Sequence, residues 1–345
     1  MKLGLFVNEV QTELPQYTST CLALEAVQRG HEVWYIEAGD FAHETDDLLY
    51  AHARRAPKKK YDSLEEYLGD VQGEKAKAER ILVEDLDVLM LRNDPSLELT
   101  KRPWAQNAGV IFGQVAADRG VLVLNDPHGL AQALNKLYFL QFPASVRPST
   151  LVTRSTEDVQ AFVRDHDGVA VIKPLSGSGG QGVFLVREVA NLNQMIEAVA
   201  RDGYVMVQEY LPAAEKGDVR LFLVNGVPFE HNGKYAAFAR IRKGKDMRSN
   251  MRVGGQAEKA RITDEMLELA EAVRPKLIRD GMFFVGLDVA GDKLMEINVF
   301  SPGGLHSASK LTKVNFVGKM IDALERKVEY ERLDRKVTNT ELAML

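Results

Sequence analysis

The first forty residues alternate between strand-like and helix-like hydrophobic patterns, and this alternation limits the possible folds most strongly. Residues 2–7 form an apolar run typical of a buried strand, and residues 31–37 form a second one. Between them, an apolar stripe over residues 22–27 predicts a helix that ends at Gly30. A strand, a helix and a strand in this order predict a doubly wound α/β sheet. The turn after the first strand has no G-x-G-x-x-G motif, so the dinucleotide fingerprint is absent.

Length and charge narrow the function classes. The chain has 345 residues, which at roughly 100–200 residues per domain predicts two or three domains. Its net charge is −5, from 44 basic and 49 acidic residues, whereas a dedicated nucleic-acid binder normally has a basic excess. The basic run at residues 54–60 is therefore interpreted as a solvated loop, with a polyanion-binding site as the alternative.

Two further features concern the compartment. Cys21 is the only cysteine, which excludes an intrachain disulfide and a cysteine-based zinc site, and we expect it to be an inert packed thiol. The apolar run at residues 3–7 is too short for a signal peptide, and no stretch approaches the ~18–20 apolar residues of a membrane span. These features predict a soluble cytoplasmic protein without a membrane or nucleic-acid partner.

A lysine followed by a glycine-rich loop is the first candidate for chemistry. Lys173 ends an apolar strand, and residues 176–182 then hold four glycines and two serines. Glycines allow several backbone N–H groups to point at one phosphate. The loop is not a Walker A motif, but a strand-borne lysine with a glycine-rich flap can hold a triphosphate. The alternative for the loop is a flexible hairpin tip. A second lysine, Lys136, lies earlier in the sequence on a predicted helix, and the alternative for it is an exposed side chain.

The strand at residues 205–211 is a candidate seat for adenine. A strand edge can pair its backbone with the donor and acceptor edge of the ring, and Glu209 would accept from ribose hydroxyls. The alternative is a core strand with one exposed acid.

Three oxygen-bearing residues near residue 290 predict a metal site. Glu296 and Asn298 are two apart on a strand, so they share one face. Oxygen ligands suit Mg²⁺, which takes one or two carboxylates together with phosphate oxygens. Asp288, on the preceding strand, joins that face only if the connecting loop has an odd number of residues, because an even loop would place it on the other side. The alternative is the solvated face of an edge hairpin.

Arginines are frequent between these motifs. Arg220, Arg240, Arg242 and Arg248 carry the planar fork that suits carboxylates and phosphates, although a surface role is the alternative for each one. The sequence has neither H-E-x-x-H nor G-x-S-x-G. A reaction that needs nucleotide phosphates, Mg²⁺ and positive charge therefore fits better than one that needs a protein nucleophile.

Several of these motifs occur together and in order in a known family. The segments are LNDPHGLAQALNKLYF, VIKPLSGSGGQGVF, VQEYLPAAEKGDVRLFLVNGVP and FVGLDVAGDKLMEINV, followed by Ser301-Pro302. Through them the chain resembles the prokaryotic-type glutathione synthetases of the ATP-grasp superfamily, over roughly residues 1–302.

The resemblance implies a fold and a domain plan. We expect an ATP-grasp fold preceded by a Rossmann-like doubly wound domain. The expected parts are an N-terminal domain at 1–128, a lid subdomain at 129–204, a catalytic subdomain at 205–330 and a tail at 331–345. A long amphipathic helix from about 308 to 328 would close the fold. The resemblance also implies a homo-oligomer.

The resemblance further implies an ATP-dependent carboxylate–amine ligase. In this family, ATP phosphorylates γ-glutamylcysteine, and glycine then attacks the acylphosphate to give glutathione, ADP and phosphate. ATP would be bound by Lys136, Lys173, Ser178, Gly179, Gly180, Gln208, Glu209, Tyr210, Leu211 and Asp218. Two Mg²⁺ or Mn²⁺ ions would be held by Asp288, Glu296 and Asn298. The catalytic residues would be Arg220, Arg240, Arg248 and Asn250, and the substrate would contact Arg92, Ser301, Gly303 and Gly304.

Two departures from the family pattern bear on the substrate. The usual Arg-Lys-Asp-Pro is Arg-Asn-Asp-Pro at residues 92–95, which removes one charge. Residues 303–310 replace the usual Thr-Cys/Gly-Ile-Arg-Glu with a Gly-Gly step that would open a helix toward a carboxylate, with Lys310 one turn on. The alternatives to glutathione synthesis are therefore a related ligase with a different acid or amine, a nucleotide-binding regulator without turnover, and nucleic-acid binding through residues 54–60.

Overall fold

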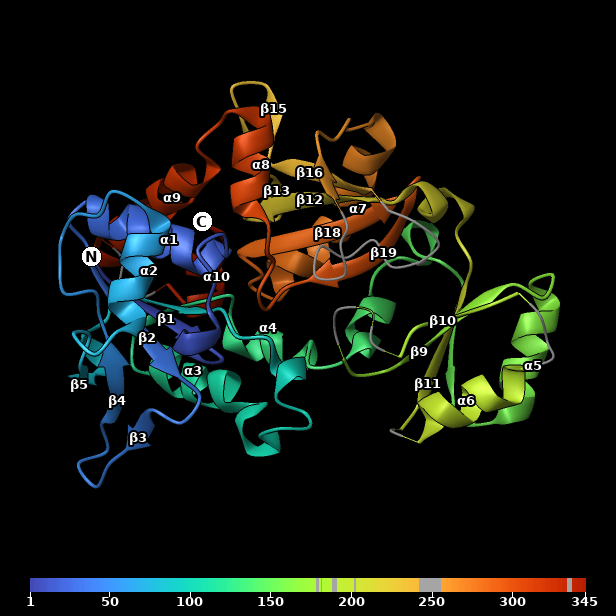
Figure 1. Ribbon diagram of the computed structural model, residues 1–345, viewed down its shortest axis with the longest axis horizontal. Helices are drawn as coiled ribbons and strands as arrows, with labels where there is room; N and C mark the ends of the chain where they lie inside the picture. The colour runs from blue at the N-terminus through green and yellow to red at the C-terminus, as the bar shows by residue number, and fades with distance from the viewer. Residues whose placement is uncertain (178–179, 181, 188–190, 202, 242–255, 334–336) are drawn as a thin grey trace.

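The part of the chain that the structure describes contains three larger β-sheets and one two-stranded sheet. The computed structural model describes residues 1–345 except 178–179, 181, 188–190, 202, 242–255 and 334–336. Figure 1 shows the N-terminal sheet at the left, the C-terminal sheet near the middle and a small sheet at the right. Among the described residues, no helix is both long and apolar enough to cross a membrane.

The N-terminal sheet is doubly wound, as the opening pattern predicts. Its strands are β1 Lys2–Val7, β2 Glu32–Glu37, β3 Phe41–His43, β4 Leu49–Arg54, β5 Ala78–Leu82, β6 Val88–Leu91 and β7 Leu122–Leu124. They run in the order β3-β4-β2-β1-β6-β7, with β5 paired to β4, and β2-β1-β6-β7 are parallel. The helices of this part are α1 Thr18–Gln28, α2 Leu64–Gln72, α3 Ala108–Asp118 and α4 Pro127–Gln132.

The basic run at residues 54–60 lies just after β4 and faces acidic side chains. The Lys58 ammonium lies 2.8 Å from a Glu66 carboxylate oxygen and 3.1 Å from one of Asp70. Arg55 lies 3.3 Å from Glu79. Acidic partners thus offset part of the positive charge, which favours the interpretation as a solvated loop over a polyanion-binding site.

The small sheet has a hydrophobic core of its own. Its strands are β8 Thr150–Thr153, β9 Ala170–Pro174, β10 Phe184–Val186 and β11 Val205–Glu209, in the order β10-β9-β11-β8. Helices α5 Thr156–Asp165 and α6 Leu192–Ala200 pack against it through Val159 and Ile196, which are buried together with Ile172 and Val207. Because β11 belongs to this sheet, the sheet extends beyond residue 204, where we expected the lid subdomain to end.

The C-terminal sheet carries most of the predicted chemistry. Its strands are β12 Asp218–Val224, β13 Val227–Pro228, β16 Ala237–Ile241, β17 Gln256–Glu258, β18 Phe284–Ala290 and β19 Lys293–Asn298. They run in the order β17-β16-β12-β18-β19, with β13 paired to β12. A small hairpin, β14 Glu230–His231 and β15 Lys234–Tyr235, and helix α7 Asp264–Arg279 complete this part.

The chain ends in three helices instead of one long helix and a tail. These are α8 Leu305–Thr312, α9 Phe316–Leu333 and α10 Asn339–Met344. The single helix expected over 308–328 is wrong, because Lys313 adopts a left-handed conformation (φ 59°) that ends α8. Within the expected tail, Asn339 donates to and accepts from the backbone of Val123 in β7, so α10 is docked on the N-terminal sheet.

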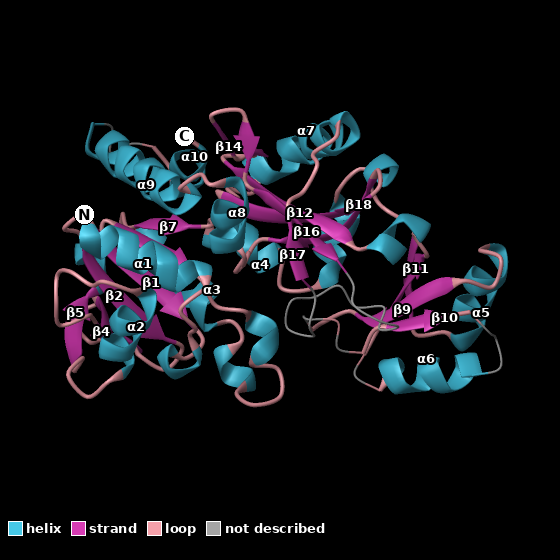
Figure 2. Ribbon diagram, turned by 45° about the horizontal axis from the view of Figure 1, so that its top comes forward, coloured by secondary structure: helices cyan, strands magenta, loops and turns pink. Residues whose placement is uncertain are grey.

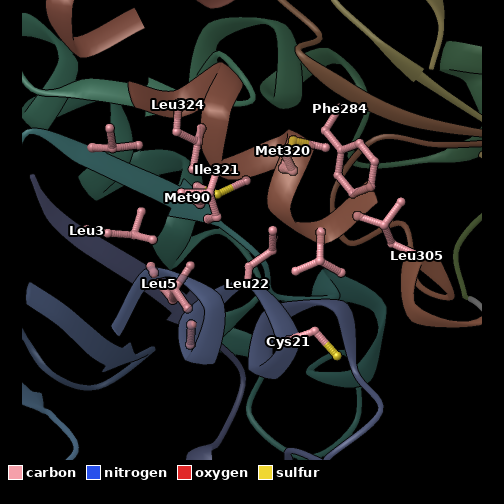
Figure 3. Close-up of a cluster of buried hydrophobic side chains, with 14 of the residues drawn as sticks. Leu3, Leu5, Cys21, Leu22, Met90, Phe284, Leu305, Met320, Ile321 and Leu324 are labelled. Carbon is pink, nitrogen blue, oxygen red and sulfur yellow. The ribbon is translucent and has the colours of Figure 1, made fainter. Parts of the chain in front are cut away.

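A shared core joins the N-terminal sheet to the C-terminal part. Helix α9 lies beside α1 in both views of the molecule (Figures 1 and 2). In Figure 3, Leu3 of β1 and Leu22 of α1 lie in one buried cluster with Ile321 and Leu324 of α9 and Phe284 of β18. The two large sheets therefore form one body, whereas the small sheet packs mainly within itself.

Candidate active site

Two adjoining cavities lie where the three sheets meet. The smaller cavity, about 170 Å³, is lined by Lys136 and Lys173 among others. The larger cavity, about 630 Å³, is lined by Arg92, Arg220 and Arg240 among others. Four residues line both cavities, namely Asp94, Glu296, Asn298 and Ser301. A group bound in one cavity would therefore meet a group bound in the other beside Glu296 and Asn298.

The two predicted lysines come together in the smaller cavity. Lys136 begins a 3₁₀ helix, Lys136–Gln141, and its ammonium donates to the carbonyls of Pro174 (3.0 Å) and Gly177 (2.8 Å). Lys173 lies on β9. Burial lowers the pKa of Lys173 to about 8, against the attraction of Glu296 and with a further lowering by the charge of Lys136. Two ammonium groups that line one cavity favour an anionic ligand between them.

The glycine-rich loop is only partly described. Ser176 and Gly177 line the smaller cavity, whereas Gly180 forms a turn at φ 77° and does not line it. Ser178 and Gly179 lie outside the described residues, as do Arg242, Arg248 and Asn250.

Of the two interpretations of residues 205–211, the structure supports the core strand, whereas a role of residues 208–211 in binding adenine stays a prediction. β11 lies between β9 and β8, and the Glu209 N–H donates to the Ser149 carbonyl at 2.9 Å. The Gln208 amide donates to the Thr150 hydroxyl at 2.9 Å, so this side chain is also engaged within the sheet. From β11, Met206 lines the smaller cavity, and residues 208–211 are not among its described lining residues. The backbone of β11 is hydrogen-bonded to neighbouring segments up to Glu209. Of residues 208–211, which we predicted to bind ATP, Tyr210 and Leu211 lie beyond the paired strand.

The β18–β19 hairpin places the three predicted oxygen-bearing side chains on one face. Asp288 lies directly opposite Glu296, and Asn298 lies two residues further on. The loop is even, because Ala290 pairs with Lys293 around a two-residue turn, so the prediction that an even loop places Asp288 on the other face is wrong. A β-bulge at Asp288/Val289 supplies the extra residue instead and restores the common face.

Asp288 lies at the centre of a balanced charge cluster. Arg220, opposite Asp288 on β12, donates to both carboxylate oxygens at 2.7 Å, and Arg240 donates to one of them at 2.7 Å. Arg240 also donates from Nε to Asp218 at 2.8 Å. Burial alone would raise the pKa of Asp288, but the two guanidinium groups outweigh it and hold the pKa below its usual value. Asp218, which we expected near the nucleotide, thus positions Arg240.

The donor set at this face fits a hard cation. Among the described residues, no group of three or more His, Cys, Asp or Glu side chains could hold a metal. A cation here would therefore use Glu296 and the amide oxygen of Asn298, completed by phosphate oxygens, which is the oxygen-only environment of Mg²⁺. Asp288 would join only by giving up part of its contact with the arginines.

The larger cavity holds the residues expected to contact substrate. Arg92 is buried and donates to the Pro302 carbonyl at 3.1 Å, and Arg220 donates to the Gly303 carbonyl at 3.2 Å. Gly304 caps α8 at φ 98°, where a Cβ would lie 2.5 Å from the Phe238 ring. The side chain of Lys310 is exposed and is not among the residues that line the cavity.

A third wall of this cavity could not be predicted from the motifs of the sequence. Residues between β1 and α1 line it, including Asn8, Glu13 and Tyr17, together with Ser19 of α1. The Asn8 amide donates to Glu98 at 2.7 Å and accepts from the Asp94 N–H at 2.7 Å, which ties this wall to the end of β6. The available signal was the position of these polar residues at the carboxyl end of a parallel strand, where open α/β sheets bind ligands. Cys21 lies behind this wall, and burial raises its pKa to about 12, as expected for an inert thiol.

Comparison with known proteins identifies the family. Residues 1–131 match the model of the prokaryotic glutathione synthetase N-terminal domain, and residues 135–313 match that of the prokaryotic glutathione synthetase ATP-grasp domain. The glutathione synthetase of Synechococcus elongatus is 36% identical over 340 residues, which covers 94% of this chain and 98% of the relative. The Escherichia coli glutathione synthetase is 32% identical over 336 residues, covering 96% of this chain and 100% of the relative.

Solved structures agree on the fold. The ATP-grasp ligase PsnB, complexed with a minimal precursor, superposes with a TM-score of 0.60 at 16% identity, covering 94% of this chain and 99% of PsnB. The D-cycloserine synthetase DcsG gives 0.59 at 15% identity, covering 90% of this chain and 99% of that one. The expected ATP-grasp fold with a preceding N-terminal domain is therefore confirmed. The chain belongs to the prokaryotic glutathione synthetase family and is an ATP-dependent ligase that forms a carbon–nitrogen bond.

Proposed function

We propose that the chain joins γ-glutamylcysteine to glycine with ATP, and releases glutathione, ADP and phosphate. The observation that carries this proposal is the meeting of a lysine-lined cavity with an arginine-lined cavity at Glu296 and Asn298. The first suits a nucleotide and the second an acid with more than one charge. Whole-length relatives named glutathione synthetase support the same substrates.

The proposed reaction has two steps. First, an oxygen of the dipeptide's C-terminal carboxylate attacks the γ-phosphorus of ATP, and the bond to the ADP oxygen breaks. Second, the glycine nitrogen attacks the acyl carbon of the acylphosphate, phosphate leaves, and the surplus ammonium proton passes to solvent. Both steps bring anions together, so positive side chains that are positioned in advance lower the barrier.

The residues of the two cavities divide this work. Lys136 and Lys173 would bind the phosphates of ATP, and Arg220 and Arg240 would stabilise the transferring phosphoryl group. Asp288 would position both arginines through the bonds described above. We also retain Arg248 and Asn250 as proposed catalytic residues on the basis of the family resemblance.

We further propose that Mg²⁺ accompanies ATP in this site. Glu296 and Asn298 would hold it, with two ions expected from the family resemblance, and Mn²⁺ as a possible substitute. When bound, the metal supplies positive charge to the phosphate oxygens. A homo-oligomeric state and a cytoplasmic location also stay predictions.

The experiment that tests the proposal is ADP release by the purified protein with ATP and Mg²⁺. Release should require γ-glutamylcysteine and glycine together, because the acylphosphate turns over only when the amine arrives. Protein that binds ATP but releases no ADP with these substrates would contradict the proposal. A panel of other acids and amines would then test the rival ligase, which the Gly303-Gly304 segment favours.

A further inference from the structure

Glu13 is an acidic residue in the wall of the larger cavity that the proposed reaction does not use. It follows the 3₁₀ turn Val10–Thr12, and its backbone is fixed by bonds from its N–H to the Val10 carbonyl (3.2 Å) and from the Gln72 amide to its own carbonyl (3.1 Å). Glu13 is 9% exposed and lines the cavity. The loop therefore fixes the backbone of an acidic residue at the cavity wall.

This carboxylate has little compensation from the described part of the chain. Thr20 donates to it over a long 3.5 Å contact, and no described lysine, arginine or histidine lies within the 4 Å of an ion pair. Burial raises the pKa of Glu13 to about 7, while the charge of Arg92 and the Thr20 hydroxyl pull it down. A buried carboxylate with so few partners is costly unless a ligand supplies the missing charge.

Arg92 places the opposite charge in the same cavity. It is 5% exposed, one of its terminal nitrogens donates to Pro302, and its Nε has no hydrogen-bond partner among the described residues. Glu13 and Arg92 thus interact through space without forming an ion pair. A carboxylate and a guanidinium that share a cavity without pairing fit a ligand that carries an ammonium and a carboxylate on one carbon. The ammonium would meet Glu13 and the carboxylate would meet Arg92.

The position of the pair indicates which end of the ligand it would meet. Glu296 and Asn298 line both cavities, whereas Glu13 and Arg92 line only the larger one. The carboxylate that reacts must lie at the shared boundary, next to the nucleotide. The other end of the acid substrate must therefore lie toward the N-terminal wall.

We propose that Glu13 binds the α-ammonium of the γ-glutamyl end of the acid substrate, beside an α-carboxylate held by Arg92. This inference rests on the proposed function, because it takes the acid to be γ-glutamylcysteine. It makes Glu13 a specificity-determining residue that discriminates against acids without an ammonium at this position.

The test compares two acid substrates in the wild type and in Glu13→Gln. The substrates are γ-glutamylcysteine and glutaryl-cysteine, which has the same skeleton with hydrogen in place of the α-ammonium. Loss of one charge-assisted bond should raise the KM of Glu13→Gln for γ-glutamylcysteine about tenfold to a hundredfold, with kcat nearly unchanged. The KM for glutaryl-cysteine should not rise, so the preference of the wild type should collapse.

Glu9→Gln is the matched control. Glu9 is on the same loop, but its side chain is 42% exposed and pairs with Arg102 at 3.2 Å outside the described lining of the cavity. The KM of this variant for both acids should equal that of the wild type. Thermal unfolding and the KM for ATP should be unchanged in both variants.

Two results would overturn the assignment. An equal rise in the KM for both acids would show that Glu13 acts only on the shape of the cavity. A rise confined to the KM for glycine would show that Glu13 binds the ammonium of glycine and not that of the acid substrate. If Glu13→Gln does not fold, the wild type alone decides, because equal KM values for the two acids contradict the proposal. Failure of the wild type to form glutathione would instead refute the proposed function itself.

Discussion

Lys173 shows how a single side chain links burial to nucleotide binding. Its ammonium is largely removed from water and lies near a second ammonium, that of Lys136, so its pKa is lowered to about 8. The group therefore loses its proton as the pH rises through about 8. The positive charge available to a triphosphate falls in the same direction.

We predict that ATP binding weakens above pH 8 because only protonated Lys173 pairs with phosphate. The dissociation constant of a non-hydrolysable ATP analogue should rise by up to about tenfold per pH unit between pH 8 and 9.5. Calorimetric titration at several pH values measures it. Lys173→Arg is the control, because guanidinium stays charged throughout this range. Parallel pH profiles for the wild type and this variant would contradict the role of Lys173.

Only part of the site could be predicted from individual residues of the sequence. Lys136, Lys173, Asp288, Glu296 and Asn298 stand out because an apolar context makes a polar residue conspicuous. Glu13 does not stand out, since it lies in a polar loop where any acid is ordinary. Only its burial in the folded chain reveals it.

At the scale of elements, local pattern predicted strands and helices well, but not how the strands pair. The strands expected at residues 2–7 and 31–37 are β1 and β2, and residues 55–60 follow β4 as a loop. The interior place of β11 and the bulge opposite Glu296 depend on neighbours far along the chain. A period-2 pattern fixes which side chains share a face within one strand. Which side chains lie opposite each other on two strands depends on the partner strand and its register.

Gly217 sets the start of β12, where Asp218 meets Arg240. Its φ of 110° and ψ of −160° lie in a region that is nearly restricted to glycine, and a Cβ would lie 2.0 Å from the Arg240 carbonyl oxygen. We predict that Gly217→Ala lowers the free energy of unfolding by at least ~2 kcal/mol and reduces kcat, because it separates β12 from β16. Urea unfolding and steady-state kinetics measure the two effects.

Gly233→Ala is the matched control for that variant. Gly233 also has a positive φ, 70°, but a Cβ there would meet nothing within 4 Å. It should lose only about 1 kcal/mol of stability, from backbone strain, and no activity. Equal effects of the two substitutions would show that the contact with Arg240 has no special role.

At the scale of the whole molecule, the N-terminal and C-terminal sheets share their core. Sequence patterns within each segment could not show this, because the two helices in contact, α1 and α9, lie near opposite ends of the sequence. Arg29, which caps the C-terminus of α1, for example, donates to Asp322 of α9 at 2.7 Å. The wall that carries Glu13 and the hairpin that carries Glu296 are therefore held in fixed relation by one body.

Lys327 anchors the end of this body. It is 2% exposed and donates to the carbonyls of Leu342 (3.1 Å) and Ala343 (3.0 Å) in α10 and to the Asn225 side chain (3.0 Å). We predict that Lys327→Met lowers the free energy of unfolding by about 2–4 kcal/mol, because it leaves buried acceptors without a donor. Chemical denaturation followed by tryptophan fluorescence measures the change.

Lys319→Met, on the same helix, is the control for that prediction. Lys319 pairs with Asp322 at the surface, at 2.9 Å, and should contribute less than about 1 kcal/mol. If both variants unfold at the same denaturant concentration as the wild type, α10 does not depend on Lys327.

In the proposed reaction, ATP activates the carboxylate of one substrate for attack by the amine of another. The most direct measurement uses γ-glutamylcysteine labelled with ¹⁸O in its C-terminal carboxylate, with ATP, Mg²⁺ and glycine, and analyses the products by mass spectrometry. An acylphosphate intermediate predicts that one ¹⁸O passes to the released phosphate for each glutathione formed. Glutathione formed together with phosphate that carries no ¹⁸O would rule out an acylphosphate intermediate.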